Sequence, residues 1–364
     1  MGDDSIFLLS GQDRSRTPCW KKSKFLCPLL FTLGVACLGL IIGLGYLKHA
    51  YHEPIDLRIM ALNCWGVPGS FGAYDKEKRM VAIGEEIIKR EYDVYLLEEL
   101  WMRNDHATIK KITTGNGLYM TEIYELGPYG TCEGRWTPLG CSGLAIVSKY
   151  PFIETEFNVF SVHGDGKKID GEFEARKGVG RVRIEPIPNI TLDLFVTHTA
   201  ASNDNSYYRE IQAREIVNHV KNSTADFAIL GGDFNIDPRM NETTYHTLTS
   251  ELSSAMQEFF HYLEVLLSPN HATYANPNNT YSAGYVDGPQ LYDYIFHTAQ
   301  GWNSVVVNLF EVPFLKSLIS GEGTEEVAET NSTSGKGVRT TSRLVSLSDH
   351  EAVTSHLLLY KYRT

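Results

Sequence analysis

The sequence is poor in cysteine and has no excess of positive charge. Six of its 364 residues are cysteines, and only Cys64, Cys132 and Cys141 follow the one long apolar run. The Gly- and Pro-containing segment between Cys132 and Cys141 suits a loop closed by a disulfide, which leaves Cys64 free. The formal net charge is −11. Because nucleic-acid affinity comes largely from Lys and Arg beside phosphates, this charge disfavours a nucleic-acid partner.

The one long apolar run predicts a membrane anchor. Residues 25–47 carry no charged side chain, and a helix of that length crosses a hydrocarbon core of ~30 Å at ~1.5 Å per residue. A cleaved signal peptide is the alternative, but it has a shorter apolar region and small residues before its cleavage site. Basic residues cluster before the run, so the positive-inside rule predicts a single-pass type II protein with a lumenal or extracellular C-terminal part.

Glycosylation sequences agree with this orientation, because Asn-x-Ser/Thr sites are used only in the secretory lumen. They lie at Asn189, Asn222, Asn241, Asn278 and Asn331, all after residue 47. We therefore expect a cytoplasmic tail over 1–24, a transmembrane anchor over 25–47, a linker over 48–56 and a globular domain over 57–364. Residues 320–343 have almost no large apolar side chains, which predicts a disordered insertion.

Strand and helix patterns alternate from residue 57 onward. Apolar residues at helical spacing predict helices over 75–91 and 207–220. Short apolar or alternating runs predict strands over 57–63, 93–97, 143–148, 152–160, 178–187, 190–197, 225–230, 292–297, 304–312 and 352–360. Two packed sheets with helices on the outside accommodate this order. The expected fold class is therefore α/β (α+β), a layered sandwich of sheets and helices.

Polar side chains stand at the ends of these strands. Asp233 and Asn235 follow the buried run at 225–230, and residues two apart on extended chain point to the same side. Taken singly, each such residue also suits a turn, a solvated edge or a histidine bonded to backbone. Together they offer oxygen and imidazole ligands but no cysteine, which suits Mg²⁺ better than zinc. The other strand-end residues are Asn63, Glu98, Glu99, His198, Asp293, Asp349 and His350.

Six segments resemble, in order, the motifs of Mg²⁺-dependent neutral sphingomyelinases, which belong to the deoxyribonuclease-I-like endonuclease/exonuclease/phosphatase superfamily. The resemblance covers roughly residues 57 to 360 and implies a four-layered α/β/β/α sandwich. Family members with C-terminal membrane spans differ from this chain, whose apolar run is N-terminal. The segments are Leu62–Gly66, Leu96–Trp101, Val196–His198, Gly232–Asn235, Tyr292–Tyr294 and Leu347–Ala352.

Carried over position by position, the resemblance makes Glu99 the principal Mg²⁺ ligand, with Mn²⁺ as an alternative metal, and gives Asn63 a supporting role. Glu98 stands where the family often has Gln or Asn and is less suited to bind metal. His350 resembles the general base, held by Asp293. Such a base deprotonates the water that attacks a phosphodiester, while the cation neutralises the charge that develops.

The resemblance places the remaining candidates around the phosphoryl group. Asp233, Asn235 and His198 are expected near its oxygens, and Asp349 next to metal or base. Lys177 resembles a lysine found near the site in the family. Its acidic partner is left open by the sequence, which offers Asp170, Glu172 and Glu174, and an exposed charged loop is the alternative for the whole segment.

The sequence thus predicts a membrane-anchored sphingomyelinase that releases ceramide and phosphocholine from a membrane lipid. The alternatives on the same fold are a nuclease, a phosphoinositide phosphatase and a lysophospholipid phospholipase C, because fold does not fix substrate. A lumenal receptor or adhesion module would leave the strand-end residues unexplained. Trp65 and Trp101 suit either core packing or a quaternary ammonium group, and Trp136 in the Cys132–Cys141 loop suits lipid contact. No oligomeric state follows from the sequence.

Overall fold

The strand expected over 57–63 is β1, which runs from Ile55 to Asn63. Asn63 is its last residue and so lies at the end opposite the one where the chain enters the strand. The computed structural model describes residues 31–40, 50–67, 73–127, 141–168, 171–240, 243–260, 271–283, 285, 288–323 and 339–363. Among these, Glu53–Tyr362 belong to one compact unit.

Two six-stranded sheets form the centre of this unit. The first has the order β11-β14-β1-β2-β4-β3, with β2 (Val94–Glu98), β3 (Tyr119–Met120), β4 (Ala145–Ser148), β11 (Ser304–Glu311) and β14 (Val353–Tyr360). The second has the order β5-β6-β7-β8-β10-β9, with β5 (Glu154–Val159), β6 (Gly178–Ile187), β7 (Ile190–His198), β8 (Phe227–Asp233), β9 (Ser253–Ser254) and β10 (Asp293–Ala299). A two-stranded ladder pairs β12 (Lys316–Gly323) with β13 (Arg339–Ser346).

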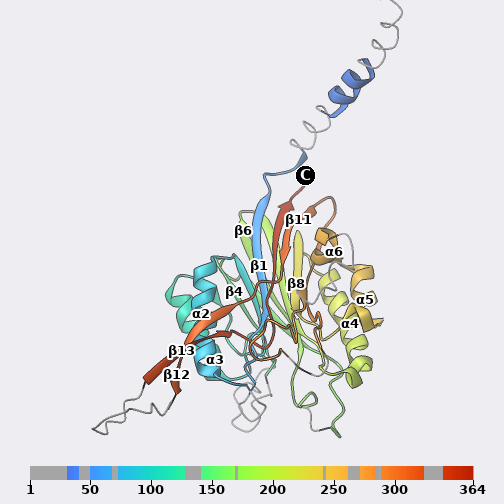
Figure 1. Ribbon diagram of the computed structural model, residues 1–364. Helices are drawn as coiled ribbons and strands as arrows, with labels where there is room; N and C mark the ends of the chain where they lie inside the picture. Colours follow the sequence, from blue (N-terminus) through green and yellow to red (C-terminus); the bar gives the residue numbers. More distant parts are fainter. Residues whose placement is uncertain are drawn as a thin grey trace, which may run out of the picture. The chain divides into compact units, whose positions relative to one another are not determined.

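Helices cover the outer faces of both sheets (Figure 1). Helices α2 and α3 lie beside the first sheet, and α4 and α5 beside the second. The period of two residues along β1 explains this layering, because Leu57 and Ile59 face the core between the sheets while Met60 and Leu62 face the cluster beneath α2. The helices are α2 (Lys76–Arg90), α3 (Arg103–Gly115), α4 (Ser206–Lys221), α5 (Thr243–Glu251) and α6 (Ala255–Phe260), with short 3₁₀ turns at Asn203–Asn205 and Pro238–Met240.

Two glycines in β8, just before Asp233, allow close approach of the facing sheet and of the neighbouring strand β7. A Cβ atom at Gly231 would lie 2.6 Å from Leu96 of the facing sheet, and one at Gly232 would lie 2.0 Å from the Thr197 carbonyl oxygen. Gly232 also has a φ of 149°, which disfavours residues with a side chain. The Gly-Gly pair therefore sets the position of the polar residue that follows it.

The expected two-sheet α/β sandwich is confirmed. The described flanks of the expected insertion at 320–343 pair as β12 and β13 and so satisfy their backbone groups. Residues 324–338 lie outside the described part. Of the expected span at 25–47, only 31–40 are described, and they are helical. Within the described ranges no helix combines the length and apolar character needed to cross a bilayer.

Candidate active site

Strand ends from both sheets bring polar residues to one edge of the sandwich. In the first sheet β1 and β2 are parallel, and their last residues, Asn63 and Glu98, are neighbours in register. In the second sheet β7 and β8 are parallel and end at the neighbours His198 and Asp233. Strand β10 runs the other way and begins there, with Asp293 beside Asp233. The sequence predicted this gathering from strand ends alone.

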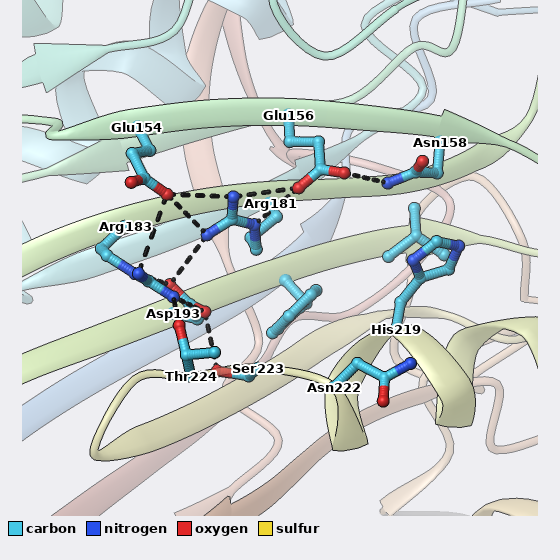
Figure 2. Close-up of a pocket in the computed structure, with 12 residues that line it drawn as sticks. Glu154, Glu156, Asn158, Arg181, Arg183, Asp193, His219, Asn222, Ser223 and Thr224 are labelled. Carbon is cyan, nitrogen blue, oxygen red and sulfur yellow. Dashed lines mark hydrogen bonds and ion pairs between the residues drawn. The ribbon is translucent and has the colours of Figure 1, made fainter.

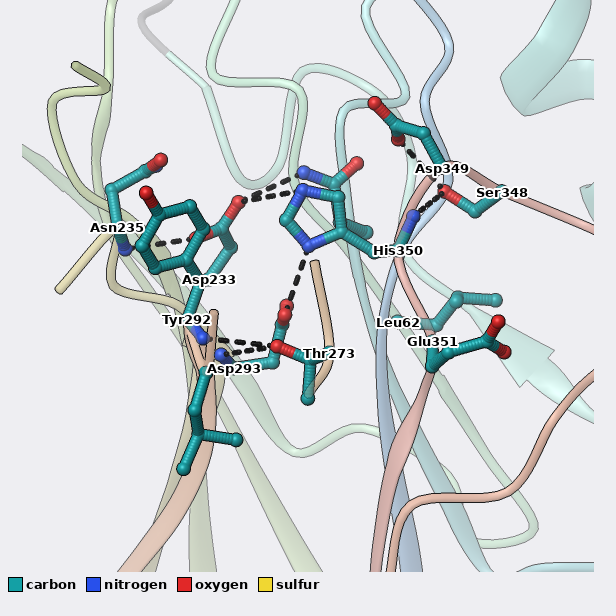
Figure 3. Close-up of polar contacts among 12 residues, drawn as sticks. Leu62, Asp233, Asn235, Thr273, Tyr292, Asp293, Ser348, Asp349, His350 and Glu351 are labelled. Carbon is teal, nitrogen blue, oxygen red and sulfur yellow. Dashed lines mark hydrogen bonds and ion pairs between the residues drawn. The ribbon is translucent and has the colours of Figure 1, made fainter. Parts of the chain in front are cut away.

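His350 and Asp293 form a buried pair at this edge. His350 Nδ1 lies 2.9 Å from Asp293 Oδ2, and His350 Nε2 lies 3.7 Å from Asp233 Oδ2 (Figure 3). The backbone N–H of Asp293 donates to Thr273 Oγ1 at 3.2 Å, which holds the carboxylate in place. Burial alone would lower the pKa of His350, but the carboxylates of Asp293 and Asp233 outweigh it, and the pKa is raised well above the ordinary value.

Asp233 links the two sheets. Its Oδ2 accepts a hydrogen bond from Asn63 Nδ2 at 3.0 Å, and its Oδ1 accepts the backbone N–H of Asn235 at 2.9 Å. The Asn235 side chain donates to the Thr199 carbonyl oxygen at 3.2 Å. Burial and the neighbouring Asp293 raise the pKa of Asp233 to about 6. The His350 charge and the hydrogen bonds from Asn63 and Asn235 oppose this shift.

Lys177 lies at the same edge, in contact with His198. The residue is buried, with 3% of its surface exposed. Its ammonium Nζ lies 2.8 Å from Glu172 Oε1, 3.2 Å from His198 Nε2 and 2.9 Å from the Thr199 carbonyl oxygen. Glu172 is thus the acidic partner that the sequence left open, and an exposed charged loop is excluded. Burial and the Lys177 charge lower the pKa of His198, which keeps this imidazole neutral.

Lys177 also fixes the tautomer of His198. An ammonium group can only donate, so the Nε2 atom that faces it is the acceptor and the proton sits on Nδ1. That Nδ1 is buried and has no hydrogen-bond partner among the described residues. His198 Nε2 also lies 3.6 Å from Asp233 Oδ2 and 4.0 Å from Glu99 Oε1.

Asp349 lies near the pair without bonding to it. Its Oδ1 accepts from Ser348 Oγ at 3.3 Å, the contact drawn between these two side chains in Figure 3. Its backbone carbonyl accepts from Ser282 Oγ at 2.6 Å. Burial raises its pKa to about 6, although His350 and Arg79 oppose the shift. Asp349 therefore contributes charge to the site and backbone anchorage to the His350 loop.

Several buried carboxylate oxygens at this edge could bind a cation. Among the described residues, both oxygens of Glu98, Glu99 Oε2 and Asp293 Oδ1 are buried without a hydrogen-bond partner. Burial raises the pKa of Glu98 and of Glu99. Hard oxygen donors without partners suit Mg²⁺, so the donor set fits the expected metal.

Three other side chains could also hold an ion together. Ligand atoms of Asp233, Asp293 and His350 lie within 4.8 Å of one another. However, His350 Nδ1 already bonds to Asp293, and its Nε2 can serve either as a ligand or as a base. The expected ligands Glu99 and Asn63 stay a prediction, and metal binding there would leave His350 Nε2 available as a base.

Arg79 is a site residue that the sequence analysis missed. This fully buried guanidinium donates to the carbonyl oxygens of Cys64 at 2.9 Å, Trp65 at 2.9 Å and Leu347 at 3.0 Å. It also donates to the Tyr74 carbonyl at 2.8 Å. The first two carbonyls follow Asn63 and the third precedes the His350 loop. Arg79 therefore ties together the two segments that carry these residues.

The aromatic candidates have structural roles where they are described. Trp65 is buried, and the Arg79 guanidinium carbon lies 4.7 Å from its ring centroid. Trp101 is buried against Gly143 and near the His198 ring. Neither indole face is open to a lipid headgroup, so core packing is the correct reading for both. Cys141 is disulfide-bonded, while Cys132 and Trp136 lie outside the described residues.

A separate pocket of about 400 Å³ lies on the second sheet beside the end of α4 (Figure 2). Its charged residues are paired with one another. Buried Asp193 accepts from Arg183 Nε and Nη2, each at 2.7 Å, and Arg181 bridges Glu154 and Glu156. None of the predicted site residues lines it. This network stabilises the sheet and is distinct from the candidate active site.

Comparison with known proteins agrees with the fold. The model of the Endonuclease/Exonuclease/phosphatase family matches residues 60–350. An inositol phosphosphingolipids phospholipase C from Schizosaccharomyces pombe is 28% identical over 191 residues, covering 50% of this chain and 42% of that protein. A putative neutral sphingomyelinase from Drosophila melanogaster is 30% identical over 193 residues, covering 51% and 40%. The matched region thus spans less than half the length of either relative.

A solved structure shares the fold. A beta toxin mutant from Staphylococcus aureus, crystallised with bound magnesium ions, superimposes with a TM-score of 0.54. The two sequences are 20% identical, and the match covers 83% of this chain and 99% of the toxin. At this identity the likeness establishes the fold of the chain.

Proposed function

Because the chain belongs to the endonuclease/exonuclease/phosphatase family, we propose that it is a Mg²⁺-dependent phosphodiesterase that hydrolyses sphingomyelin to ceramide and phosphocholine. The names of both sequence relatives, a phosphosphingolipid phospholipase C and a putative sphingomyelinase, support a sphingolipid substrate. The observation that carries the proposal is the buried His350–Asp293 pair, which lies at the edge where the unpaired carboxylate oxygens gather.

His350 acts as the general base in this proposal. Its Nδ1–H donates to Asp293, which fixes the tautomer and leaves Nε2 to accept a proton from water. The Asp293 carboxylate then stabilises the imidazolium that forms. The water oxygen attacks phosphorus, the bond to the ceramide oxygen breaks, and the imidazolium returns a proton to that oxygen, so that ceramide and phosphocholine leave.

Lys177, His198, Asn235 and Asp233 organise the surroundings of the phosphoryl oxygens. The Lys177 ammonium supplies fixed positive charge and is held by the neutral His198 imidazole, whose Nε2 accepts a hydrogen bond from it. This positive charge opposes the negative charge that develops during attack, and burial strengthens its effect. Asp233 holds the Asn63 side-chain amide through Oδ2 and the Asn235 backbone N–H through Oδ1.

Glu99 and Asn63 would hold the Mg²⁺ ion, with Mn²⁺ as an alternative. When bound, the cation neutralises charge on the phosphoryl oxygens and on the departing alkoxide. Glu99 suits this role because its side chain is 16% exposed and its Oε2 has no partner among the described residues. Asn63 presents an amide beside it, and its contact with the carboxylate lowers the pKa of Glu99 against the effect of burial.

We also propose that the chain is a type II membrane protein with a lumenal or extracellular catalytic domain. The arrangement is a tail over 1–24, an anchor over 25–47, a linker over 48–56 and a catalytic domain over 57–364. Three of the glycosylation asparagines, Asn189, Asn222 and Asn278, are exposed, which supports access by the glycosylation machinery. The other two, Asn241 and Asn331, lie outside the described residues.

The full chain in detergent, offered several substrates side by side, tests the proposed activity. Labelled sphingomyelin, lysophospholipid, phosphoinositide and plasmid DNA are each incubated with Mg²⁺ and, in parallel, with EDTA. We expect phosphocholine release from sphingomyelin that EDTA abolishes, and slower or no reaction with the others. Preferred cleavage of DNA or phosphoinositide would replace the proposed substrate, and full activity in EDTA would overturn the metal assignment.

A further inference from the structure

Glu98 is a buried carboxyl group for which the fold provides no partner. It is the last residue of β2 and is 0% exposed. Neither of its oxygens accepts or donates a hydrogen bond among the described residues. Buried carboxylates in folded proteins are normally paired, because an isolated charge in the interior costs several kcal/mol. An isolated one at a candidate active site therefore points to a ligand.

The surroundings of Glu98 are acidic. Its register neighbour Asn63 donates to Asp233, which places Glu98 beside the carboxylates of the second sheet. Asp293 and Asp233 are the charges that act most strongly on it, ahead of His350. Lys177, a fixed cation at this edge, is already bonded to Glu172. Glu98 thus lies among carboxylates, and no cation among the described residues bonds to it.

Backbone geometry brings Glu98 and Glu99 to the same site although they are adjacent in sequence. Consecutive residues of a strand point to opposite faces. Glu99, however, has a φ of 58° in the left-handed region, where the strand ends and the chain turns. Both carboxyl groups interact electrostatically with Asp233 and His350 as a result. A strained conformation at a non-glycine residue is typical of functional sites.

We propose that Glu98 is a ligand of the divalent cation together with Glu99, so that the metal centre has two adjacent carboxylates. This inference rests on the metal dependence proposed above, and it assigns a residue that family resemblance leaves out. The cation supplies the partner that Glu98 lacks. The alternative is a Glu98 that remains a neutral acid and only fills space between the sheets.

Glu98→Gln separates these two roles, because glutamine keeps the shape and hydrogen-bonding capacity of a neutral acid but cannot carry the charge. Mn²⁺ binding to the full chain in detergent is measured from the loss of the free-ion electron paramagnetic resonance signal, so no turnover is required. Glu99→Gln serves as the positive control. Asp193→Asn, which alters a buried carboxylate in the separate paired network, is the matched control.

If Glu98 is a ligand, Glu98→Gln should weaken Mn²⁺ binding by about 10- to 100-fold, the range seen when groups supporting a metal site are removed. Asp193→Asn should bind Mn²⁺ like the wild type. Unchanged affinity in Glu98→Gln with loss in Glu99→Gln would overturn this inference and leave the proposed function intact. A wild-type chain that binds no Mn²⁺ would overturn both.

Thermal unfolding provides a second measurement that requires no turnover. Saturating Mn²⁺ should raise the unfolding temperature of the wild type more than that of Glu98→Gln, since metal binding stabilises the wild type more. A neutral Glu98 would leave the two proteins with equal metal-induced shifts, which contradicts the proposal.

Discussion

His350 and Asp293 are 57 residues apart in sequence, yet His350 Nδ1 lies 2.9 Å from Asp293 Oδ2. Asp293 begins β10 of the second sheet, and His350 lies just before β14 of the first. The pair therefore joins the two sheets at their polar edge. It also raises the pKa of His350 despite burial, so the imidazole reacts to any change in nearby charge.

Replacing Asp293 with asparagine should shift the pH profile. The Asp293 and Asp233 carboxylates stabilise the imidazolium and so raise the pKa of His350. Removing one of them lowers that pKa, and because the base must be neutral to act, the acid limb of kcat/KM should move to lower pH. The maximum rate should fall by about 100-fold or more, since a weaker and less oriented base remains. An acid limb that stays in place would show that another group titrates there, with His198 the next choice.

Lys177→Met should lower kcat and leave KM little changed. The buried ammonium opposes charge that develops only during attack, so its loss acts on the transition state. The expected loss is about 100- to 1,000-fold, the cost of removing one preorganised electrostatic donor. Lys149→Met is the control, because Lys149 is partly exposed and pairs with Asp93 at 3.0 Å away from the site. A rise in KM alone would assign Lys177 to ground-state binding instead.

Arg79→Lys should destabilise the folded chain and reduce turnover at temperatures where it remains folded. Lysine has the charge but cannot reach the carbonyls of Cys64, Trp65 and Leu347 together. Two buried carbonyls without donors would cost about 2–6 kcal/mol, at ~1–3 kcal/mol each. Thermal unfolding compares it with Arg90→Lys, which changes a surface pair with Glu86. Equal unfolding temperatures for the two variants would refute the role of Arg79 in holding these two backbone segments together.

The predicted topology is tested in sealed microsomes. Residues after 47 should resist added protease until detergent opens the membrane, and glycosidase treatment should increase gel mobility. Substituting Asn189, Asn222 and Asn278 singly with Gln should remove one glycan each, because all three are exposed. Digestion of the catalytic domain in intact vesicles would place it in the cytoplasm and reverse the orientation.

The strand-end residues could be predicted from sequence because each buried strand leaves a readable apolar run. The polar residue that ends such a run has a known place, at the edge shared by parallel strands. Asn63, His198, Asp233 and Asp293 were located in this way, and the structure brings them together. The assignment of individual roles still comes from the family resemblance, and it stays a prediction.

Other parts of the site have no sequence signal of this kind. Arg79 acts on backbone carbonyls, which look the same in every sequence. Glu172 could not be chosen from among nearby acids, because loop conformation decides which carboxylate reaches Lys177. Glu98 resembles a solvated strand end, but the close approach of the second sheet buries it. Helix α3 was not expected, since Arg103–Gly115 buries few of its side chains and most of them are polar.

Hydrolysis in water enriched in oxygen-18 tests the central claim, that His350 activates water for attack at the phosphorus of sphingomyelin. The full chain in detergent is incubated with sphingomyelin and Mg²⁺, and both products are examined by mass spectrometry. The account predicts labelled phosphocholine and unlabelled ceramide, with the reaction abolished in His350→Ala. Labelled ceramide, or release of free choline with ceramide phosphate, would contradict it.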